Sequence, residues 1–400
     1  MRMGYRYAVL GSGRQGVALA YDLARNGEAE LVRLVDVDGK VAARAARRLR
    51  KLLPRSKCRF EAGACDVERR KEVHAALSDA QAALSAVPYR FNARLAAWAI
   101  ERGVSFLDLG GNTAVVRAEL ALHRRAARAG ASIVPDCGLA PGLGNHLVAH
   151  ALASMDEPRH AHVRCGGLPE RPVGPLGYKL VFNFHGLWNE YRGEAEFLRG
   201  GEVVRVPTLT EPEAFHSPEL GMLEACVTSG ATSTCPRTWK GVLESFDYKT
   251  IRHPGHWDRI RALFELGYMD EECVARDGTR FAPLALSKEL FESRLAFEKV
   301  RDIVILRVVV RGAHRGRPLE LRYDLFDRHD ARTGFTAMER TTAFPAALVA
   351  HMQARGLVEP GARPLETSVP ALRYFDELPA HGIHVRMARA AGSRAPRARG

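Results

Sequence analysis

The first chemical signal in the sequence is a glycine-rich run that can hold a phosphate. Gly11-Ser12-Gly13-Arg14-Gln15-Gly16 has the spacing G-x-G-x-x-G and lies between an apolar run and an amphipathic stretch. In that context the first glycine permits a tight turn, the second lets a pyrophosphate approach the backbone, and the third allows a helix to pack closely on a strand. The helix start also offers free N–H groups to the anion. The run predicts a dinucleotide site, and a purely structural glycine turn is the alternative.

An acidic residue stands where such a site needs one. Asp36 follows Gly16 by 20 residues, at the end of the second apolar run, where a carboxylate can accept hydrogen bonds from the adenosine ribose. A carboxylate there repels the 2′-phosphate of NADP, so we expect NAD as the cofactor rather than NADP. Lys40 and Arg44 lie close by in the sequence and oppose this preference.

Small and polar residues follow the fourth, fifth and sixth apolar runs. Parallel strands present their carboxyl ends at one edge of a sheet, and the nicotinamide of a bound dinucleotide lies over that edge. We therefore expect these segments to line the cofactor. Besides the glycine turn and Asp36, the residues predicted to bind it are Ala86, Val87, Pro88 and Asn112.

Two carboxylates and one thiol in these segments are the candidate catalytic residues. Asp108 ends the fifth run, and Asp136 and Cys137 follow the sixth. A carboxylate at this edge of the sheet can serve in an active site as a general acid or base. Capping of a helix or turn is the alternative for both aspartates, and a buried packing role is the alternative for Cys137. The sequence leaves open which group takes the proton.

Alternating apolar runs and amphipathic stretches must position these residues. Their spacing predicts an N-terminal α/β domain over residues 1–138, a Rossmann domain with a doubly wound parallel sheet. The strands are predicted at 7–10, 31–35, 58–61, 82–87, 104–108 and 132–134, and the helices near 14–26, 39–53, 67–78, 91–102 and 114–129.

After Pro135 the segments become longer and richer in Gly, Pro, Thr and aromatic residues. We expect a second α+β domain over 139–335, with a mostly antiparallel sheet that binds the substrate. A helical stretch over 341–355 places residues 336–385 back on the first domain, and the basic tail 386–400 is expected to be disordered. Strand-like pieces are predicted near 160–165, 179–184 and 202–206, with a hairpin of 302–311 and 318–327 around the turn 312–316.

Composition narrows the class of protein. The chain has 400 residues, 46% hydrophobic and 26% charged, and it carries 59 basic and 46 acidic residues. Neither a run long enough to cross a membrane nor a basic stripe interleaved with aromatics is visible, so we expect no membrane and no nucleic-acid partner. Seven cysteines without a Cys-x-x-Cys pair, and a start that lacks a signal-peptide apolar region, favour a cytoplasmic protein. We expect no bound metal, because the histidines lack carboxylate or cysteine partners at ligand spacing.

Several stretches together resemble the saccharopine dehydrogenase and L-lysine 6-dehydrogenase family. The likeness covers about residues 5 to 385, is most specific over 228–256, and lies closest to the lysine 6-dehydrogenase branch. Ala231 and His253 depart from the pattern, which puts the substrate pocket in question. The stretches that carry the likeness, besides the glycine turn, are 87–92, 106–111, 135–142, 189–191, 228–234, 247–256 and 336–342.

The resemblance implies an NAD(P)-linked oxidation at a carbon that bears an amine, giving an imine that water opens to a carbonyl. For lysine this would be oxidative deamination to the semialdehyde, which closes to a cyclic imine. The alternatives are saccharopine cleavage or reduction, a polyamine-forming transferase that uses NAD, and a non-catalytic nucleotide sensor. The family also implies a homodimer.

The substrate candidates come from the second domain. An amino-acid substrate needs a cationic anchor for its carboxylate and an acceptor for its ammonium group. Lys249, Arg252 and His256 are the candidate anchors, since the turn at Pro254-Gly255 could present them together. Ammonium acceptors and neighbouring hydroxyls complete the predicted set, namely Glu190, Tyr191, Thr228, Ser229 and Thr232.

Overall fold

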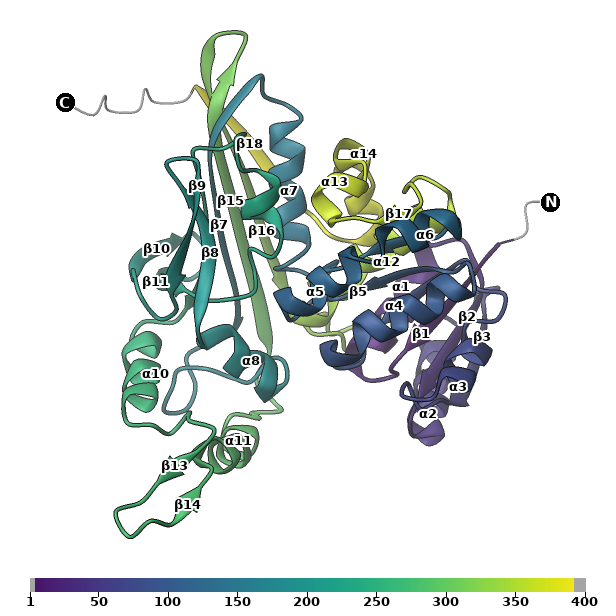
Figure 1. Ribbon diagram of the computed structural model, residues 1–400, viewed down its shortest axis with the longest axis horizontal. Helices are drawn as coiled ribbons and strands as arrows, with labels where there is room; N and C mark the ends of the chain where they lie inside the picture. The colour runs from purple at the N-terminus through teal and green to yellow at the C-terminus, as the bar shows by residue number, and fades with distance from the viewer. Residues whose placement is uncertain (1–3, 392–400) are drawn as a thin grey trace.

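A computed structural model describes residues 4–391, which form two large sheets with helices packed around them. Figure 1 shows the N-terminal sheet on the right, the second sheet on the left, and the helices of the C-terminal segment beside the first domain. The α/β class and the two-sheet architecture predicted from the sequence are confirmed.

The first sheet is parallel in every described strand pair and has the order β17-β6-β5-β4-β1-β2-β3. The chain moves outward from β1 to β3 and then crosses to β4 on the other side of β1, so the order reverses between β1 and β4. Ligands bind at such a switch point, outside the carboxyl ends of the strands. The strands are β1 (Tyr5–Leu10), β2 (Ala29–Asp36), β3 (Arg59–Ala64), β4 (Ala82–Ser85), β5 (Ser105–Asp108), β6 (Ser132–Val134) and β17 (Gly361–Ala362).

The helices of this domain form because their apolar residues share one face. In α2, for example, Ala42, Ala45 and Leu49 are buried at helical spacing while the basic residues between them face solvent. The helix predicted at 114–129 is in fact two helices, α5 and α6. The helical elements are α1 (Arg14–Asn26), α2 (Gly39–Leu52), α3 (Arg70–Ala76), η1 (Tyr89–Phe91), α4 (Asn92–Glu101), α5 (Thr113–Leu120) and α6 (His123–Arg128).

The second sheet is mostly antiparallel, as predicted, and has the order β10-β11-β12-β7-β15-β16-β18, with β8 bridging β12 and β9. Among its described pairs, β12 with β7 is parallel. The hairpin turn is shorter than predicted, because only Arg315 and Gly316, both with positive φ, separate its strands. The strands are β7 (Glu157–Pro169), β8 (Glu194–Arg199), β9 (Glu202–Pro207), β10 (Glu213–Ser217), β11 (Gly221–Val227), β12 (Ser245–Arg252), β15 (Asp302–His314), β16 (Arg317–Arg328) and β18 (Arg386–Ala391).

One predicted strand of this domain is wrong. Residues 179–184 are not a strand, because Asn183 caps a helix there: its side-chain oxygen accepts a hydrogen bond from the Gly186 N–H at 2.7 Å. A small hairpin and α11 project at the lower left of Figure 1. The elements around the second sheet are α7 (Leu143–Leu152), α8 (Phe184–Tyr191), α9 (Cys235–Thr238), α10 (His256–Glu265), β13 (Cys273–Val274), β14 (Arg280–Phe281) and α11 (Pro283–Arg294).

The C-terminal segment joins the two domains. Its first helix, α12 (Ala337–Ala354), starts with a capping box of Thr336 and Glu339, and it packs along α1. The segment then adds β17 to the first sheet. Three short helices follow β17, namely α13 (Leu365–Ser368), α14 (Ala371–Glu377) and η2 (Leu378–His381). The expectation of a disordered tail is wrong for residues 386–391, because β18 gains a full set of partners on β16. Residues 392–400 lie outside the described residues.

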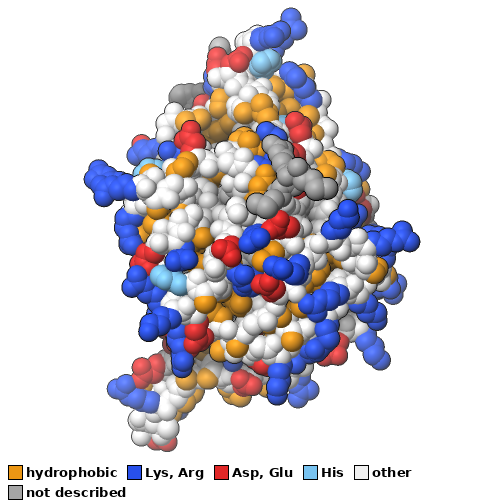
Figure 2. Space-filling model, turned by 90° about the vertical axis from the view of Figure 1, so that its right-hand side faces the viewer, with side chains coloured by type: hydrophobic (Ala, Val, Ile, Leu, Met, Phe, Trp, Pro, Cys, Tyr) orange, Lys and Arg blue, Asp and Glu red, His pale blue; other side chains and the backbone are white. Residues whose placement is uncertain are grey.

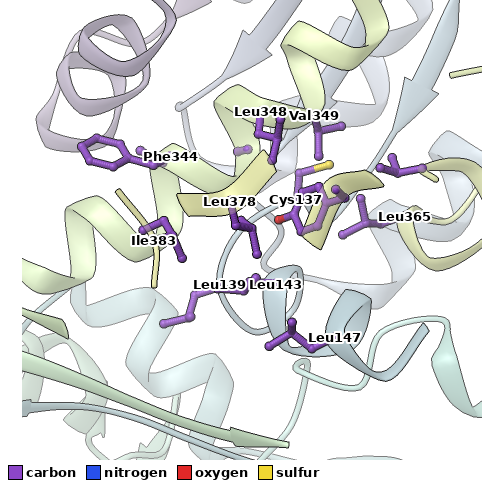
Figure 3. Close-up of a cluster of buried hydrophobic side chains, with 14 of the residues drawn as sticks. Cys137, Leu139, Leu143, Leu147, Phe344, Leu348, Val349, Leu365, Leu378 and Ile383 are labelled. Atoms are coloured by element: carbon purple, nitrogen blue, oxygen red, sulfur yellow. The ribbon is translucent and has the colours of Figure 1, made fainter. Parts of the chain in front are cut away.

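A buried apolar cluster holds this segment in place. Figure 3 shows Leu139 and Leu143 from the start of α7 packed against Leu348 of α12 and Leu378 of η2. The cluster includes Cys137 and Leu139 of the loop that follows β6, so the C-terminal segment supports the carboxyl edge of the first sheet.

Basic and acidic side chains are interspersed on the surface. Figure 2 shows Lys and Arg side chains spread over one face with acidic side chains among them. None of the helices between residues 4 and 391 has the length and apolar character needed to cross a bilayer.

Candidate active site

The glycine turn connects β1 to α1 and has the geometry of a phosphate site. A Cβ at Gly16 would lie 1.9 Å from the Gly11 carbonyl oxygen, and Gly11 itself has φ +93°, so both positions require glycine. A Cβ at Gly13 would meet nothing within 4 Å in the described part of the chain. No described side chain caps the start of α1 either. Open space over free N–H groups is what a pyrophosphate needs, and the residues present fit a dinucleotide.

Asp36 lies beside this turn, as predicted from its position in the sequence. One carboxylate oxygen accepts a hydrogen bond from the Ser12 N–H at 2.9 Å, and the other accepts one from the Asp38 N–H at 3.2 Å. The Ser12 hydroxyl also donates to the Val35 carbonyl at 3.1 Å. These bonds fix the carboxylate at the end of β2, within reach of an adenosine ribose on the turn.

Arg14 and Gln15, both predicted to bind the cofactor, contact the start of α12. Arg14 Nε lies 2.6 Å from Oε1 of Glu339, whose side chain is buried. Gln15 donates a long hydrogen bond of 3.5 Å to the Met338 carbonyl. The phosphate-binding helix is thus tied to the C-terminal segment through two polar contacts.

The other predicted cofactor residues follow β4 and β5. A Cβ at Gly11 would lie 2.8 Å from the Ala86 carbonyl oxygen and 3.0 Å from a Val87 methyl, so the β4 loop, which continues into Pro88, packs against the glycine turn. Asn112 is the N-cap of α5, since its side-chain oxygen accepts from the Ala114 N–H at 2.9 Å. Its amide nitrogen remains available at the carboxyl edge of the sheet.

Asp108 and Glu119 form a buried pair of carboxyl groups. Asp108 Oδ1 accepts hydrogen bonds from the N–H groups of Gly110, at 2.6 Å, and Asp136, at 3.3 Å. Its Oδ2 and both oxygens of Glu119 are buried without a hydrogen-bond partner among the described residues. Burial, and then the charge of Asp108, raises the pKa of Glu119 to about 11. Glu119 therefore keeps its proton at neutral pH and can donate it to Asp108.

Asp136 links the two domains. It follows β6 with a positive φ of 61°, and its Oδ2 accepts a hydrogen bond from the hydroxyl of Ser233 in the second domain. Its Oδ1 has no partner among the described residues and points at Gly110, where a Cβ would lie only 2.6 Å away. Burial, together with the charge of Asp108, raises the pKa of Asp136 well above its ordinary value. The raised pKa favours the protonated form of Asp136, and the hydrogen bond from Ser233 opposes this shift.

The prediction that Cys137 is catalytic is wrong. Its side chain is fully buried, and its thiol donates weakly to the Val134 carbonyl at 3.3 Å. Figure 3 shows it within the apolar cluster, between Val349 and Leu365. Burial raises the pKa of the thiol well above its ordinary value, so it stays protonated and has a packing role.

The second-domain candidates include a buried chain of hydrogen bonds. Arg252 Nε donates to the Tyr191 hydroxyl at 2.9 Å, and that hydroxyl lies 3.0 Å from His256 Nε2. His256 Nδ1 lies 3.0 Å from the Leu176 carbonyl, which can only accept, so Nδ1 carries the proton and Nε2 accepts from Tyr191. Burial and the neighbouring Arg252 lower the pKa of His256 to about 3, so the ring is neutral.

The same network continues through Glu190. Its carboxylate accepts from the Thr250 hydroxyl at 2.6 Å and lies 3.4 Å from Arg252 Nη2, while Thr228 shares a 2.7 Å hydrogen bond with Thr250. Arg252 is only 2% exposed. Because its charge is already paired and buried, it is not a free anchor for a substrate carboxylate, which corrects the expected role. The network instead fixes α8 on the sheet.

That fixed helix presents a residue to the first domain. Asn189 donates from Nδ2 to the Gly111 carbonyl at 2.9 Å, and Ser229 donates to the Asn189 carbonyl at 2.6 Å. Glu190 and Tyr191, next to Asn189, therefore position this contact with the loop after β5.

Lys249 does not lie with Arg252 and His256, the other two predicted substrate anchors. Side chains alternate along β12, so Lys249 lies on the opposite face of the strand from Thr250 and Arg252. Its ammonium group is 2.8 Å from Glu213 and is 9% exposed. The prediction that Lys249 and Arg252 line one pocket is wrong.

An open cleft of about 240 Å³ lies between the domains, next to Ser233. Thr232 is the one predicted substrate residue that lines it. Its walls come from α5, β8, β9 and the loop after β11, and the residues are Thr113, Arg117, Glu194, Ala195, Glu196, Arg205, Gly230, Thr232 and Ser233.

Three residues of the site are not among the predicted site residues, namely Glu119, Asn189 and Ser233, although Asn189 and Ser233 stand in stretches that carry the family likeness. For Glu119 a signal exists, because it stands three residues after Val116 on the buried face of α5, where an acid is out of place. Ser233 and Asn189 act through contacts between domains, for which the sequence has no local signal.

The first domain is a Rossmann domain with an open phosphate turn, and buried carboxyl groups lie between it and the second sheet. This is the architecture of a two-domain nicotinamide-dependent oxidoreductase. Family models agree with this class and define it further. The model described as the saccharopine dehydrogenase NADP binding domain matches residues 7–134, and that of the saccharopine dehydrogenase C-terminal domain matches residues 138–383. The chain belongs to the saccharopine dehydrogenase family, whose members are NAD(P)-dependent oxidoreductases acting on CH–NH donors.

Two relatives illustrate the similarity. The chain is 26% identical over 221 residues to a saccharopine dehydrogenase [NADP(+), L-glutamate-forming] of Schizosaccharomyces pombe, a match of 52% of this chain and 48% of that protein. The chain thus spans about half the length of this curated relative. The structure of apo saccharopine dehydrogenase (L-Glu forming) from Saccharomyces cerevisiae has a TM-score of 0.76 and 18% identity, covering 97% of this chain and 100% of that one, and so shows a shared fold.

The predicted family is therefore confirmed. The comparisons support the saccharopine alternative better than the L-lysine 6-dehydrogenase branch that the resemblance favoured. They also carry NADP in their names, where Asp36 led us to expect NAD.

Proposed function

We propose that this protein oxidises, reversibly, the C–N bond of an amino acid whose nitrogen is a secondary amine of the saccharopine type. The observation that carries the proposal is the environment of Asp136. Its Oδ1 is buried beside Gly110 without a hydrogen-bond partner among residues 4–391, and its Oδ2 is bound to Ser233 of the second domain. A proton acceptor at this edge is the group that amine oxidation requires.

In the proposed reaction the substrate carbon loses a hydride and its nitrogen loses a proton, leaving an imine. A nicotinamide nucleotide, when bound, supplies the hydride acceptor. Asp136 takes the proton on Oδ1, and Asp108 keeps the loop of Asp136 in place by accepting from its N–H. Water then adds to the imine carbon and the C–N bond breaks, giving a carbonyl compound and a primary amine. For saccharopine these are 2-aminoadipate 6-semialdehyde and L-glutamate.

We further propose NAD as the preferred nucleotide. The Asp36 carboxylate is fixed by two N–H groups at the end of β2, where a 2′-phosphate would have to approach it. Arg14, the nearest cation on the turn, is already paired with Glu339. The family model for the first domain and the Schizosaccharomyces pombe relative are named for NADP, so the proposal is that this chain differs from them.

The test is turnover of a substrate panel by the purified full chain. With NAD or NADP present, L-saccharopine should produce the near-ultraviolet absorbance of the reduced nucleotide together with L-glutamate, and NAD should give the higher kcat/KM. L-Lysine oxidation with ammonia release would favour the lysine 6-dehydrogenase alternative. Formation of a larger polyamine from diamines without free reduced nucleotide would indicate the transferase, and nucleotide binding without turnover of any amine would indicate a sensor.

A further inference from the structure

The open cleft beside Ser233 has a charge pattern that suits one kind of ligand. Arg117 and Arg205 contribute two positive charges to its lining, and Glu194 and Glu196 contribute two negative ones. A lining with equal charges of both signs selects neither an anion nor a cation. It is complementary to a zwitterion in which a carboxylate and an ammonium group are attached to the same carbon atom.

The charged groups keep bonding capacity for a ligand. Arg117 uses one guanidinium nitrogen for Glu196, at 3.2 Å, and its side chain is 52% exposed. Arg205 is 71% exposed and only loosely paired, 3.8 Å from Glu194. A guanidinium has five N–H donors in a planar fork that matches a carboxylate, so both arginines have donors free.

The carboxylate of Glu196 is fixed and kept ionised by Arg237, a residue outside the cleft. Arg237 donates to both oxygens of Glu196, at 2.8 and 3.0 Å. These hydrogen bonds lower the pKa of Glu196, which stays ionised while its own side chain is only 16% exposed. The hydroxyl of Thr232 and that of Thr113 add neutral partners on the two sides of the cleft.

The cleft also adjoins the proposed proton acceptor. Ser233 lines it and donates its hydroxyl hydrogen bond to Asp136. Ser233 therefore lies between a ligand in the cleft and Asp136. The walls belong to both domains, since α5 comes from the first and β8, β9 and the Gly230 loop from the second.

We infer that this cleft binds the α-amino-acid head group of the substrate, with the carboxylate on Arg117 and Arg205 and the ammonium on Glu194 and Glu196. The inference rests on the proposed function, because it assigns the non-reacting end of the same substrate. The site takes L-α-amino acids with a long side chain and rejects analogues that lack either charge.

Steady-state kinetics with L-saccharopine and NAD test the inference. Arg117→Met and Glu194→Gln should each raise KM for L-saccharopine about tenfold or more, because a charge-assisted hydrogen bond is lost, while kcat and the KM for NAD change less than about threefold. Arg117→Lys should recover part of the loss. Lys240→Met, which breaks an exposed pair with Glu202 outside the cleft, is the matched control and should leave both constants unchanged.

A binding measurement separates this inference from the proposed function. Calorimetry of L-saccharopine, and of L-lysine, pentane-1,5-diamine and 6-aminohexanoate, should show heat only with the two α-amino acids, and less of it with Arg117→Met. That result without turnover would support the cleft and contradict the proposed reaction. Normal turnover with an unchanged KM in Arg117→Met and Glu194→Gln, or binding of the two analogues as tight as that of lysine, would overturn the inference.

Discussion

The hydroxyl of Ser233 donates a hydrogen bond to the Asp136 carboxylate, so a loop of the second domain contacts the carboxyl end of β6 directly. This bond stabilises the ionised form of Asp136 against the burial that raises its pKa. The proton acceptor proposed for the reaction is thus adjusted by a residue from the substrate side of the molecule.

Removing this bond should change the pH dependence of oxidation. Asp136 must be ionised to accept a proton, and Ser233 lowers its pKa, so Ser233→Ala should shift the acidic limb of the kcat profile to higher pH. Asp136→Asn should lower kcat by about 10²- to 10⁴-fold at every pH. Ser293→Ala, on exposed α11, is the control. An acidic limb that stays in place in Ser233→Ala would show that Asp136 does not set it.

The Glu119 carboxyl should make the folded protein less stable as pH rises. Its pKa is about 11 when folded against an ordinary 4.5, so above pH 4.5 the unfolded chain releases a proton that the folded chain keeps. Stability is therefore highest below the ordinary pKa and declines as pH rises toward 11. Glu119→Gln removes this dependence. In urea unfolding over about pH 5 to 9, the variant should gain stability relative to the parent as pH rises. Parallel curves of stability against pH would contradict a protonated Glu119.

Asp36 should control the choice of nucleotide. Asp36→Ala removes the acceptor for the ribose hydroxyls and the charge that opposes a 2′-phosphate. We expect affinity for NADH to fall about tenfold and the preference to move toward NADPH, measured by nucleotide fluorescence titration. Asp38→Ala, which removes only the cap of α2, should keep the parent ratio. The same ratio in Asp36→Ala would mean that the ribose lies elsewhere.

Arg252 should matter for stability rather than for substrate binding. Arg252→Ala takes the charged partner from the half-buried Glu190 carboxylate and from the buried Tyr191 hydroxyl, which should cost about 3–5 kcal/mol of unfolding free energy. Arg237→Ala removes an exposed pair and should cost about 1 kcal/mol or less. Urea denaturation compares the two. Equal costs, or a folded Arg252→Ala with only a raised substrate KM, would restore the anchor role.

The first domain could be predicted closely from the sequence because its determinants are local. Buried runs alternate with amphipathic helices, and the glycine turn and Asp36 sit at fixed positions in that repeat. The second domain depends on pairings between distant strands, such as β7 with β12 and β16 with β18, which have no local signature. Residues 386–391 are exposed and have no apolar pattern, yet they pair with β16 through their backbone.

The site divides in the same way. Positions at the ends of parallel strands, such as Asp108 and Asp136, follow from topology. Lys249 was grouped with Arg252 because the two residues are close in the sequence. No strand was predicted there, and the alternation of side chains along β12 puts them on opposite faces. Whether a charged residue is free or already paired, as with Arg252 and Glu190, depends on contacts that only the folded chain forms.

The central claim is that a nicotinamide nucleotide lies on the start of α1 and faces Asp136. A crystal structure of the full chain with NADH tests it most directly. The account predicts the pyrophosphate over Gly13, the ribose on Asp36, and the nicotinamide at the carboxyl edge of the sheet, next to the loops that carry Gly110 and Asp136. A nucleotide bound elsewhere, or a turn at Gly11 to Gly16 that remains closed to it at saturating NADH and NADPH, would contradict the account.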